Sequence, residues 1–190
     1  MIEMLGVLAI VAVLSVGGIA GYSKAMSIWK MNRWSYDFIA LIHNSQTAYL
    51  TAGNFGNSAK NITDVVVSAG LIPDGMLDRN LKDIFGNRVN VLTRVWKGKY
   101  GVRLNLQYSM PAGKSAVECC NKLFEMGQLY NSLWIVWIEQ TGYGVCGVGA
   151  PASYIRDMNC DTYNKAVVSE KCKVCATRSC NVFTLLENSI

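Results

Sequence analysis

The sequence predicts an α+β protein in which the second half of a long N-terminal hydrophobic helix packs on an antiparallel sheet, followed by a disulfide-rich C-terminal region. Three observations predict this fold. A helical amphipathic pattern follows an apolar run without a break, segments with strand periodicity come later, and all seven cysteines lie between Cys119 and Cys180. We divide the 190 residues into an apolar helix over residues 1–23 and a globular head over residues 24–190.

The first 22 residues, MIEMLGVLAIVAVLSVGGIAGY, are long and apolar enough to cross a bilayer as a helix. A signal peptide is the alternative, but it requires a basic segment before the apolar run and a small-residue cleavage site after it. We expect instead that a basic leader has been removed from this chain. Such a leader would also explain why Lys24, Lys30 and Arg33 follow the run on the side to be exported, against the positive-inside tendency.

Glu3 is the one charged residue of the apolar run. A carboxylate inside a membrane costs a few kcal/mol unless it finds a partner, and the first cation along its own helix is Lys24. The nearest positive group is therefore an α-amino terminus, either that of Met1 or that of a neighbouring chain. The helix dipole also favours a carboxylate at this end. The alternative is a simple anchor at the level of the lipid headgroups.

A helical amphipathic stripe continues the apolar run, with apolar residues at spacings of three, four or seven between polar ones. Its members are Ile28, Met31, Trp34, Phe38, Leu41, Ile42 and Tyr49. The stripe ends at turn residues that begin with Gly53. Run and stripe together predict one helix of about 52 residues, roughly 78 Å long at 1.5 Å per residue.

The N-terminal sequence M-I-E-M-L-G-V-L-A-I-V-A-V-L-S-V-G-G-I-A resembles that of mature type IV pilins, particularly the type IVb branch. The resemblance is close over the apolar helix and architectural over the rest of the chain. It implies a precursor held in the bacterial inner membrane, cleaved by a prepilin peptidase, and added by a pilus assembly machinery to an extracellular helical homo-oligomer. Family members usually carry the glutamate at the fifth position, whereas it is third here. Either two residues of the mature form are missing or the processing differs.

The resemblance also implies roles for individual residues. Met1 would carry a methylated amine, and Glu3 would pair with the N-terminal amine of the adjacent subunit. Gly17, Gly18 and Gly21 each weaken a helix by about 1 kcal/mol relative to alanine. We expect this stretch to stay helical in a membrane and to melt in a filament. The implied biological roles are adhesion, aggregation, motility, DNA uptake or conjugation.

The head is predicted to begin with a short helix and an antiparallel hairpin. Residues 61–69 indicate a helix that stops at the Gly-Leu-Ile-Pro that follows. We interpret the glycosylation sequon Asn61-Ile62-Thr63 as a surface turn. Residues 88–97 are joined through Gly98 to the alternating apolar pattern of residues 100–108, which predicts the hairpin.

A second helix and two further strands complete the predicted head. Ser115 and Glu118 fit a capping box at the start of a helix that turns Val117, Cys120 and Phe124 inward. Residues 133–138, LWIVWI, predict a buried central strand, and residues 181–186 predict the last strand.

The cysteines indicate an oxidising compartment, where disulfides persist. They are Cys119, Cys120, Cys146, Cys160, Cys172, Cys175 and Cys180. Because seven is odd, at least one is free or pairs between chains, and the spacing does not fix the connectivity. A four-thiolate zinc site of Cys160 and the three cysteines after it is the alternative, but export of the head favours disulfides. In type IVb pilins a bridge ties the second helix to the C-terminal part, so the resemblance pairs Cys120 with Cys172, Cys175 or Cys180.

The sequence offers little for catalysis or nucleotide binding. The G-x-G-x-x-G pattern from Gly142 to Gly147 is followed by Gly149-Ala-Pro in place of a helix, so we interpret it as a glycine-rich turn. His43 has no acidic residue three or four positions away, which argues against a catalytic base. The cations are scattered without interleaved aromatic residues. We therefore expect no enzyme activity, no cofactor, no metal and no specific nucleic-acid site.

Two other functions fit the same pattern. A membrane-tethered binding domain that never polymerises would need the apolar helix but not Glu3. A type II secretion pseudopilin would form short periplasmic fibres, and many pseudopilins carry calcium ligands near the C-terminus. The tail here offers only Glu187 for such a site, which disfavours this alternative.

Overall fold

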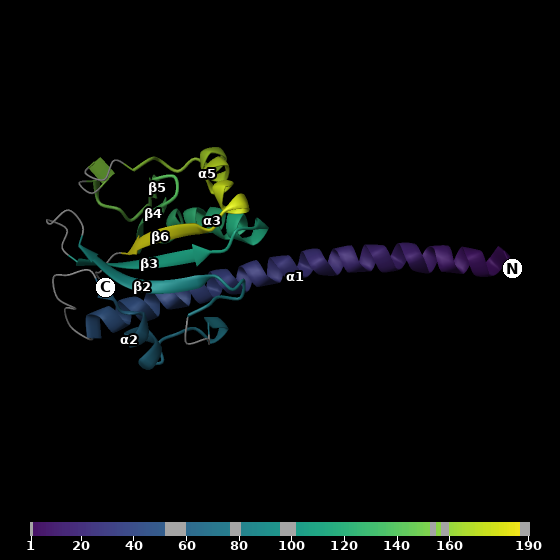
Figure 1. Ribbon diagram of the computed structural model, residues 1–190, viewed down its shortest axis with the longest axis horizontal. Helices are drawn as coiled ribbons and strands as arrows, with labels where there is room; N and C mark the ends of the chain where they lie inside the picture. The colour runs from purple at the N-terminus through teal and green to yellow at the C-terminus, as the bar shows by residue number, and fades with distance from the viewer. Residues whose placement is uncertain are drawn as a thin grey trace.

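The computed structural model describes residues 2–51, 60–76, 81–95, 102–152, 155–156 and 160–186. Helix α1 (Ile2–Thr51) is continuous over 50 residues, which confirms the predicted single helix. Its first half projects from the head as a rod, and its second half lies beside the sheet (Figure 1). Its predicted end at Gly53 lies outside the described residues.

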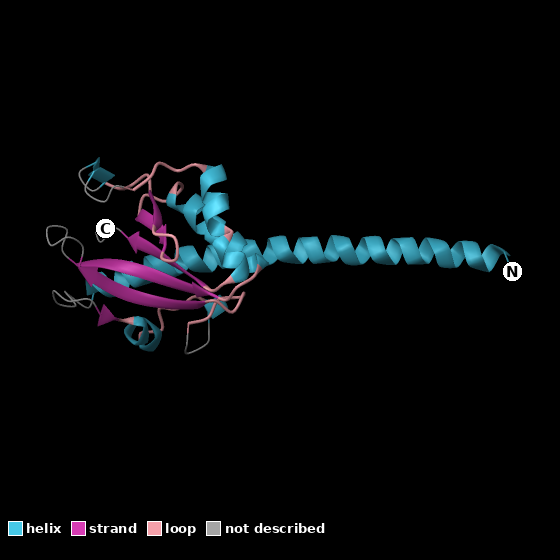
Figure 2. Ribbon diagram, turned by 45° about the horizontal axis from the view of Figure 1, so that its top comes forward, coloured by secondary structure: helices cyan, strands magenta, loops and turns pink. Residues whose placement is uncertain are grey.

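The head is built on a six-stranded sheet of order β1-β2-β3-β6-β4-β5, whose strands pair antiparallel (Figure 2). The strands are β1 (Lys60–Asn61), β2 (Arg88–Val95), β3 (Val102–Met110), β4 (Leu133–Ile138), β5 (Tyr143–Cys146) and β6 (Cys180–Leu186). Strands β2 and β3 confirm the predicted hairpin, and β4 confirms the predicted buried strand. The last strand, β6, lies between β3 and β4, so the C-terminal part of the chain joins the two halves of the sheet.

Shorter helical segments accompany the sheet, and the structure gives bounds for five of them. They are α2 (Thr63–Ser68), the 3₁₀ turn η1 (Asp74–Met76), α3 (Lys114–Gly127), α5 (Lys165–Cys172) and α6 (Val174–Thr177). Helix α2 confirms the short helix predicted within residues 61–69, and the chain leaves it through Gly70 at φ +68°. The interpretation of the sequon Asn61-Ile62-Thr63 as a surface turn is wrong, because Asn61 ends the strand β1, Thr63 begins α2, and both Ile62 and Thr63 are buried. Asn61 itself is exposed, and its Oδ1 accepts the N–H of Thr63 at 2.9 Å where the chain passes from β1 to α2.

The core lies between one face of the sheet and the helices α1 and α3. Trp34 and Phe38 of α1 stack at 5.8 Å between ring centroids, and Tyr108 of β3 meets both rings edge-on. These side chains are fully buried, as the amphipathic stripe predicts. At the start of the stripe, however, Ile28 is 53% exposed, because α1 carries it outside the part of the helix that the head covers.

The predicted capping box at Ser115 and Glu118 is wrong. Helix α3 starts at Lys114 with Gly113 as its N-cap, and no side chain caps it. The N–H of Gly113 donates to the carbonyl of Cys175 on α6 at 3.0 Å, and its φ of +153° favours glycine. This contact between distant segments sets the helix start. Glu118 instead faces Lys114, at 3.8 Å.

The interpretation of residues 142–147 as a glycine-rich turn is wrong for its middle part, which forms the strand β5. Only Gly142, at φ +66°, lies in the turn between β4 and β5. At the other end of β5 a Cβ on Gly147 would lie 1.9 Å from the carbonyl oxygen of Leu133. Glycine is therefore required there by a close approach of two backbones.

Candidate assembly surface

The first half of α1 carries a continuous apolar surface that the head does not cover. Every residue from 11 to 25 is exposed. The large apolar side chains whose exposure the structure describes in this half are 53–73% exposed, and they are Val7, Val11, Val13, Leu14, Val16, Ile19 and Tyr22. Monomeric soluble proteins rarely expose an apolar patch of this extent. Such a surface is typical of a site that contacts lipid or other protein chains.

Among the described residues, α1 is the one helix long and apolar enough to cross a membrane. This property is compatible with membrane anchoring through the N-terminal half of the helix. Lys24 follows the apolar surface, and Trp29 and Lys30 lie one to two turns later. Aromatic residues and lysines of this kind commonly mark the boundary between a bilayer and water.

The two residues predicted to direct assembly lie at the far end of α1. Glu3 is in the first turn of the helix, and Met1 lies outside the described residues. At 1.5 Å per residue, Lys24 is about 32 Å along the helix axis from Glu3. No cation on the same helix can therefore reach the Glu3 carboxylate.

Gly17, Gly18 and Gly21 lie inside the uninterrupted helix. A Cβ at any of the three would meet nothing within 4 Å, so contacts within the described chain do not require glycine at these positions. Melting of this stretch concerns the filament and stays a prediction.

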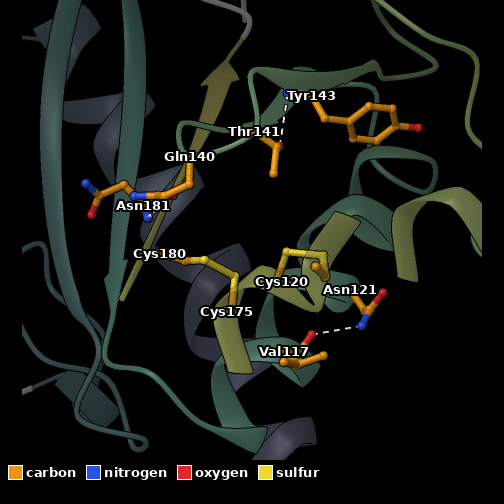
Figure 3. Close-up of a disulfide and its surroundings, with 10 residues drawn as sticks. Val117, Cys120, Asn121, Gln140, Thr141, Tyr143, Cys175, Cys180 and Asn181 are labelled. Atoms are coloured by element: carbon orange, nitrogen blue, oxygen red, sulfur yellow. Dashed lines mark hydrogen bonds between the residues drawn. A yellow bond between two sulfur atoms is a disulfide. The ribbon is translucent and has the colours of Figure 1, made fainter. Parts of the chain in front are cut away.

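Three disulfides bridge segments within the head: Cys120–Cys172, Cys146–Cys160 and Cys175–Cys180. The first confirms the predicted partner range of Cys120 and links α3 to α5. Figure 3 shows Cys120 on α3 and the Cys175–Cys180 bridge in the same region of the head. Each of the four cysteines of the alternative zinc site, Cys160, Cys172, Cys175 and Cys180, forms one of these disulfides.

Cys119 is the unpaired cysteine, and it is fully buried. Its Sγ accepts a hydrogen bond from Asn87 Nδ2 at 3.7 Å. Burial, followed by the charge of Asp83, raises the pKa of the Cys119 thiol. Because the thiolate is the reactive form, the raised pKa disfavours exchange of Cys119 with the disulfides while the head is folded.

The buried carboxyl group of Asp83 links α1 to the loop before β2 through hydrogen bonds. The sequence pattern does not reveal this role of Asp83. Its Oδ2 accepts from Trp34 Nε1 at 2.6 Å and from Asn87 Nδ2 at 2.8 Å. Its Oδ1 accepts from the backbone N–H groups of Phe85 at 2.9 Å and Asn87 at 2.8 Å. Burial raises the pKa of Asp83 above its ordinary value, and the hydrogen bonds from Asn87, Phe85 and Trp34 only partly oppose this rise.

Replacing Asp83 with asparagine is expected to change how stability depends on pH. A raised pKa in the folded protein means that folding favours the protonated carboxyl. Its contribution is therefore fully present below the ordinary Asp pKa and is lost as the pH rises through the raised value. Urea unfolding of the full chain in detergent, followed across this pH range, should show a fall in unfolding free energy that is smaller in Asp83→Asn. Identical pH slopes for the two proteins would contradict this role.

The long apolar helix, the antiparallel sheet and the C-terminal disulfides are together loosely consistent with a pilin-like fold. Comparisons of this chain with known protein families, with curated proteins and with solved structures find no match.

Proposed function

We propose that this chain is the structural subunit of an extracellular filament of the type IV pilus kind. The exposed apolar rod formed by the first half of α1, on a separate disulfide-bonded head, is the observation that carries the proposal. The rod is held in the inner membrane before assembly and in a bundle of identical rods afterwards. The heads cover the outside of that bundle, where the disulfides keep them folded.

In this proposal hydrophobic burial holds the rods together, and Glu3 sets the position of each rod along the filament. Lipid covers an apolar helix as well as other helices do, so hydrophobicity alone does not favour association within the membrane. Once the filament is in water, the same surface holds the rods together. The position of each rod along the filament needs a directional contact, and Glu3 paired with the N-terminal amine of a neighbour supplies it.

The proposed role requires no catalysis. His43, the only histidine, is exposed on α1. Among the described residues no group of three or more His, Cys, Asp and Glu side chains is placed to hold a metal ion. The proposal requires of this chain disulfide formation, processing of its N-terminus and self-association.

Material sheared from the surface of cells that express this chain tests the proposed function by electron microscopy. We expect long filaments that react with antibodies against the head and that are lost when the gene is deleted. If the chain stays in the membrane fraction and no filaments appear, the tethered binding domain replaces the filament subunit. Short fibres confined to the periplasm would instead favour the pseudopilin.

A further inference from the structure

A groove of about 350 Å³ lies where α1 enters the head, between α1 and α3. Ile28 and Met31 of α1 form its apolar part. Glu118, Asn121, Lys122 and Glu125 of α3 form its polar wall. We call it the neck groove.

The neck groove is not filled by the described residues of its own chain. Ile28 is 53% exposed although it belongs to the amphipathic stripe whose later members are buried, and Met31 is only half-buried. The groove also continues directly into the exposed apolar surface of α1, since Ile28 lies less than two turns after Tyr22. An occupant that covers this apolar surface is therefore well placed to enter the groove.

We propose that the neck groove receives the segment Gly17–Lys24 of a second copy of this chain, with Lys24 of the second copy against Glu118 of the first. This proposal rests on the proposed function and names the contact that holds one rod against the head of the next. The same contact repeats along the filament, because the groove and the inserted segment are different parts of each chain.

The segment Gly17–Lys24 fits this position sterically. Gly17, Gly18 and Gly21 have no side chains, and their surroundings within the chain are open. Small residues let two backbones approach closely, as they do between helices in membranes. The fit does not require the segment to remain helical, since a glycine backbone approaches closely in either conformation. The three glycines thereby gain a role that contacts within one chain do not give them.

Charge complementarity selects the pair of Lys24 and Glu118. Lys24 is exposed and forms no ion pair with the described residues. It follows Gly21 by three residues, so it stays next to the glycines whether or not the segment is helical. On the groove wall, Glu118 forms an ion pair with Lys114 at 3.8 Å, and the Lys114 side chain is 90% exposed. Such a surface pair is weak, whereas Glu125 is shared between Lys122 and Lys165.

Charge reversal tests the proposal in filament-forming cells. We expect Lys24→Glu and Glu118→Lys each to reduce the filament yield about tenfold or more, because each places like charges together. The double variant should recover most of the yield. Lys173→Glu is the control, because Lys173 is an exposed lysine at the C-cap of α5 that does not line the groove and pairs with Glu170 of its own chain. The yield is the sheared fraction divided by the chain in whole cells, after disulfide mapping has shown intact heads.

Cross-linking provides a measurement that does not depend on charge reversal. A photoreactive phenylalanine analogue at Asn121, inside the groove, should cross-link to a peptide containing residues 17–24 of another chain. The same analogue at Lys173 should not. Filaments that form normally but show neither charge rescue nor this cross-link would overturn the neck contact and leave the proposed function standing. Wild-type cells without filaments would overturn both.

Discussion

Replacing both Cys120 and Cys172 with serine is expected to lower the free energy of unfolding of the head by about 4 kcal/mol. The bridge closes a loop with a sequence separation of 52, so it restricts the unfolded chain strongly. It also ties α3, which carries Phe124 into the core, to α5 at the surface. Both residues are replaced because a lone Cys172 would leave Cys119, next in sequence to position 120, as a wrong partner. Urea unfolding of the full chain in detergent measures the loss.

The matched control is the pair Cys175→Ser and Cys180→Ser. All four cysteines are fully buried, so each double variant places two serine hydroxyl groups in the same kind of surroundings. The Cys175–Cys180 bridge has a sequence separation of only 5, and its removal should cost about 2 kcal/mol. Equal losses in the two variants would show that burial of the hydroxyl groups, and not loop length, determines the stability of the head.

Much of the fold could be predicted because its signals are local. The continuous apolar run and stripe predict α1, and alternation in residues 100–108 predicts β3. The apolar, β-branched run of β4 predicts a buried strand, and the structure places it between two neighbours. In each case the apolar pattern of one segment is enough to predict both the type of element and its burial.

The features that the sequence pattern predicts wrongly or does not reveal depend on contacts between segments far apart in the sequence. The start of α3 is set by the hydrogen bond from Gly113 to Cys175, which overrides a plausible capping box. Strand β5 exists because Tyr143–Cys146 pairs with β4, and Gly144 within it, with Gly142 and Gly147 at its ends, conceals the strand signal. The buried role of Asp83 is equally hidden, because an aspartate before a turn normally indicates exposed loop.

The sequence predicts where the candidate assembly surface begins on α1, but not how far along the helix it extends. The apolar run indicates that the first half of α1 needs a covering partner, and exposure of residues 11–25 agrees with this. The exposure of Ile28 and the neck groove beside it was not foreseen, because the stripe does not show where the head begins to cover the helix. That boundary depends on where α3 packs, which is a property of the whole head.

Replacing Glu3 with alanine is expected to abolish filaments while leaving the folded chain intact. Glu3 lies in the first turn of α1, about 32 Å along the axis from the first cation of its own helix. In the membrane it would sit near the headgroups and stay solvated. In a filament it would be surrounded by apolar rods, where the amine of a neighbouring chain is the group able to balance it. Removing one partner of a buried ion pair commonly costs about 3–5 kcal/mol, and this loss is repeated at every subunit added.

Immunoblots of the sheared surface fraction and of whole cells separate assembly from expression. The Glu3→Ala chain should be present at wild-type level in the membrane, with its three disulfides formed, and should be nearly absent from the sheared fraction. Glu3→Gln keeps the size and hydrogen-bonding capacity of the side chain but not its charge, so it should fail in the same way. Met4→Ala, one residue further along the rod, removes apolar surface without removing charge and should still assemble. Wild-type amounts of filament from Glu3→Ala would show that subunits find their positions without this carboxylate, and the positioning contact would then have to come from the heads.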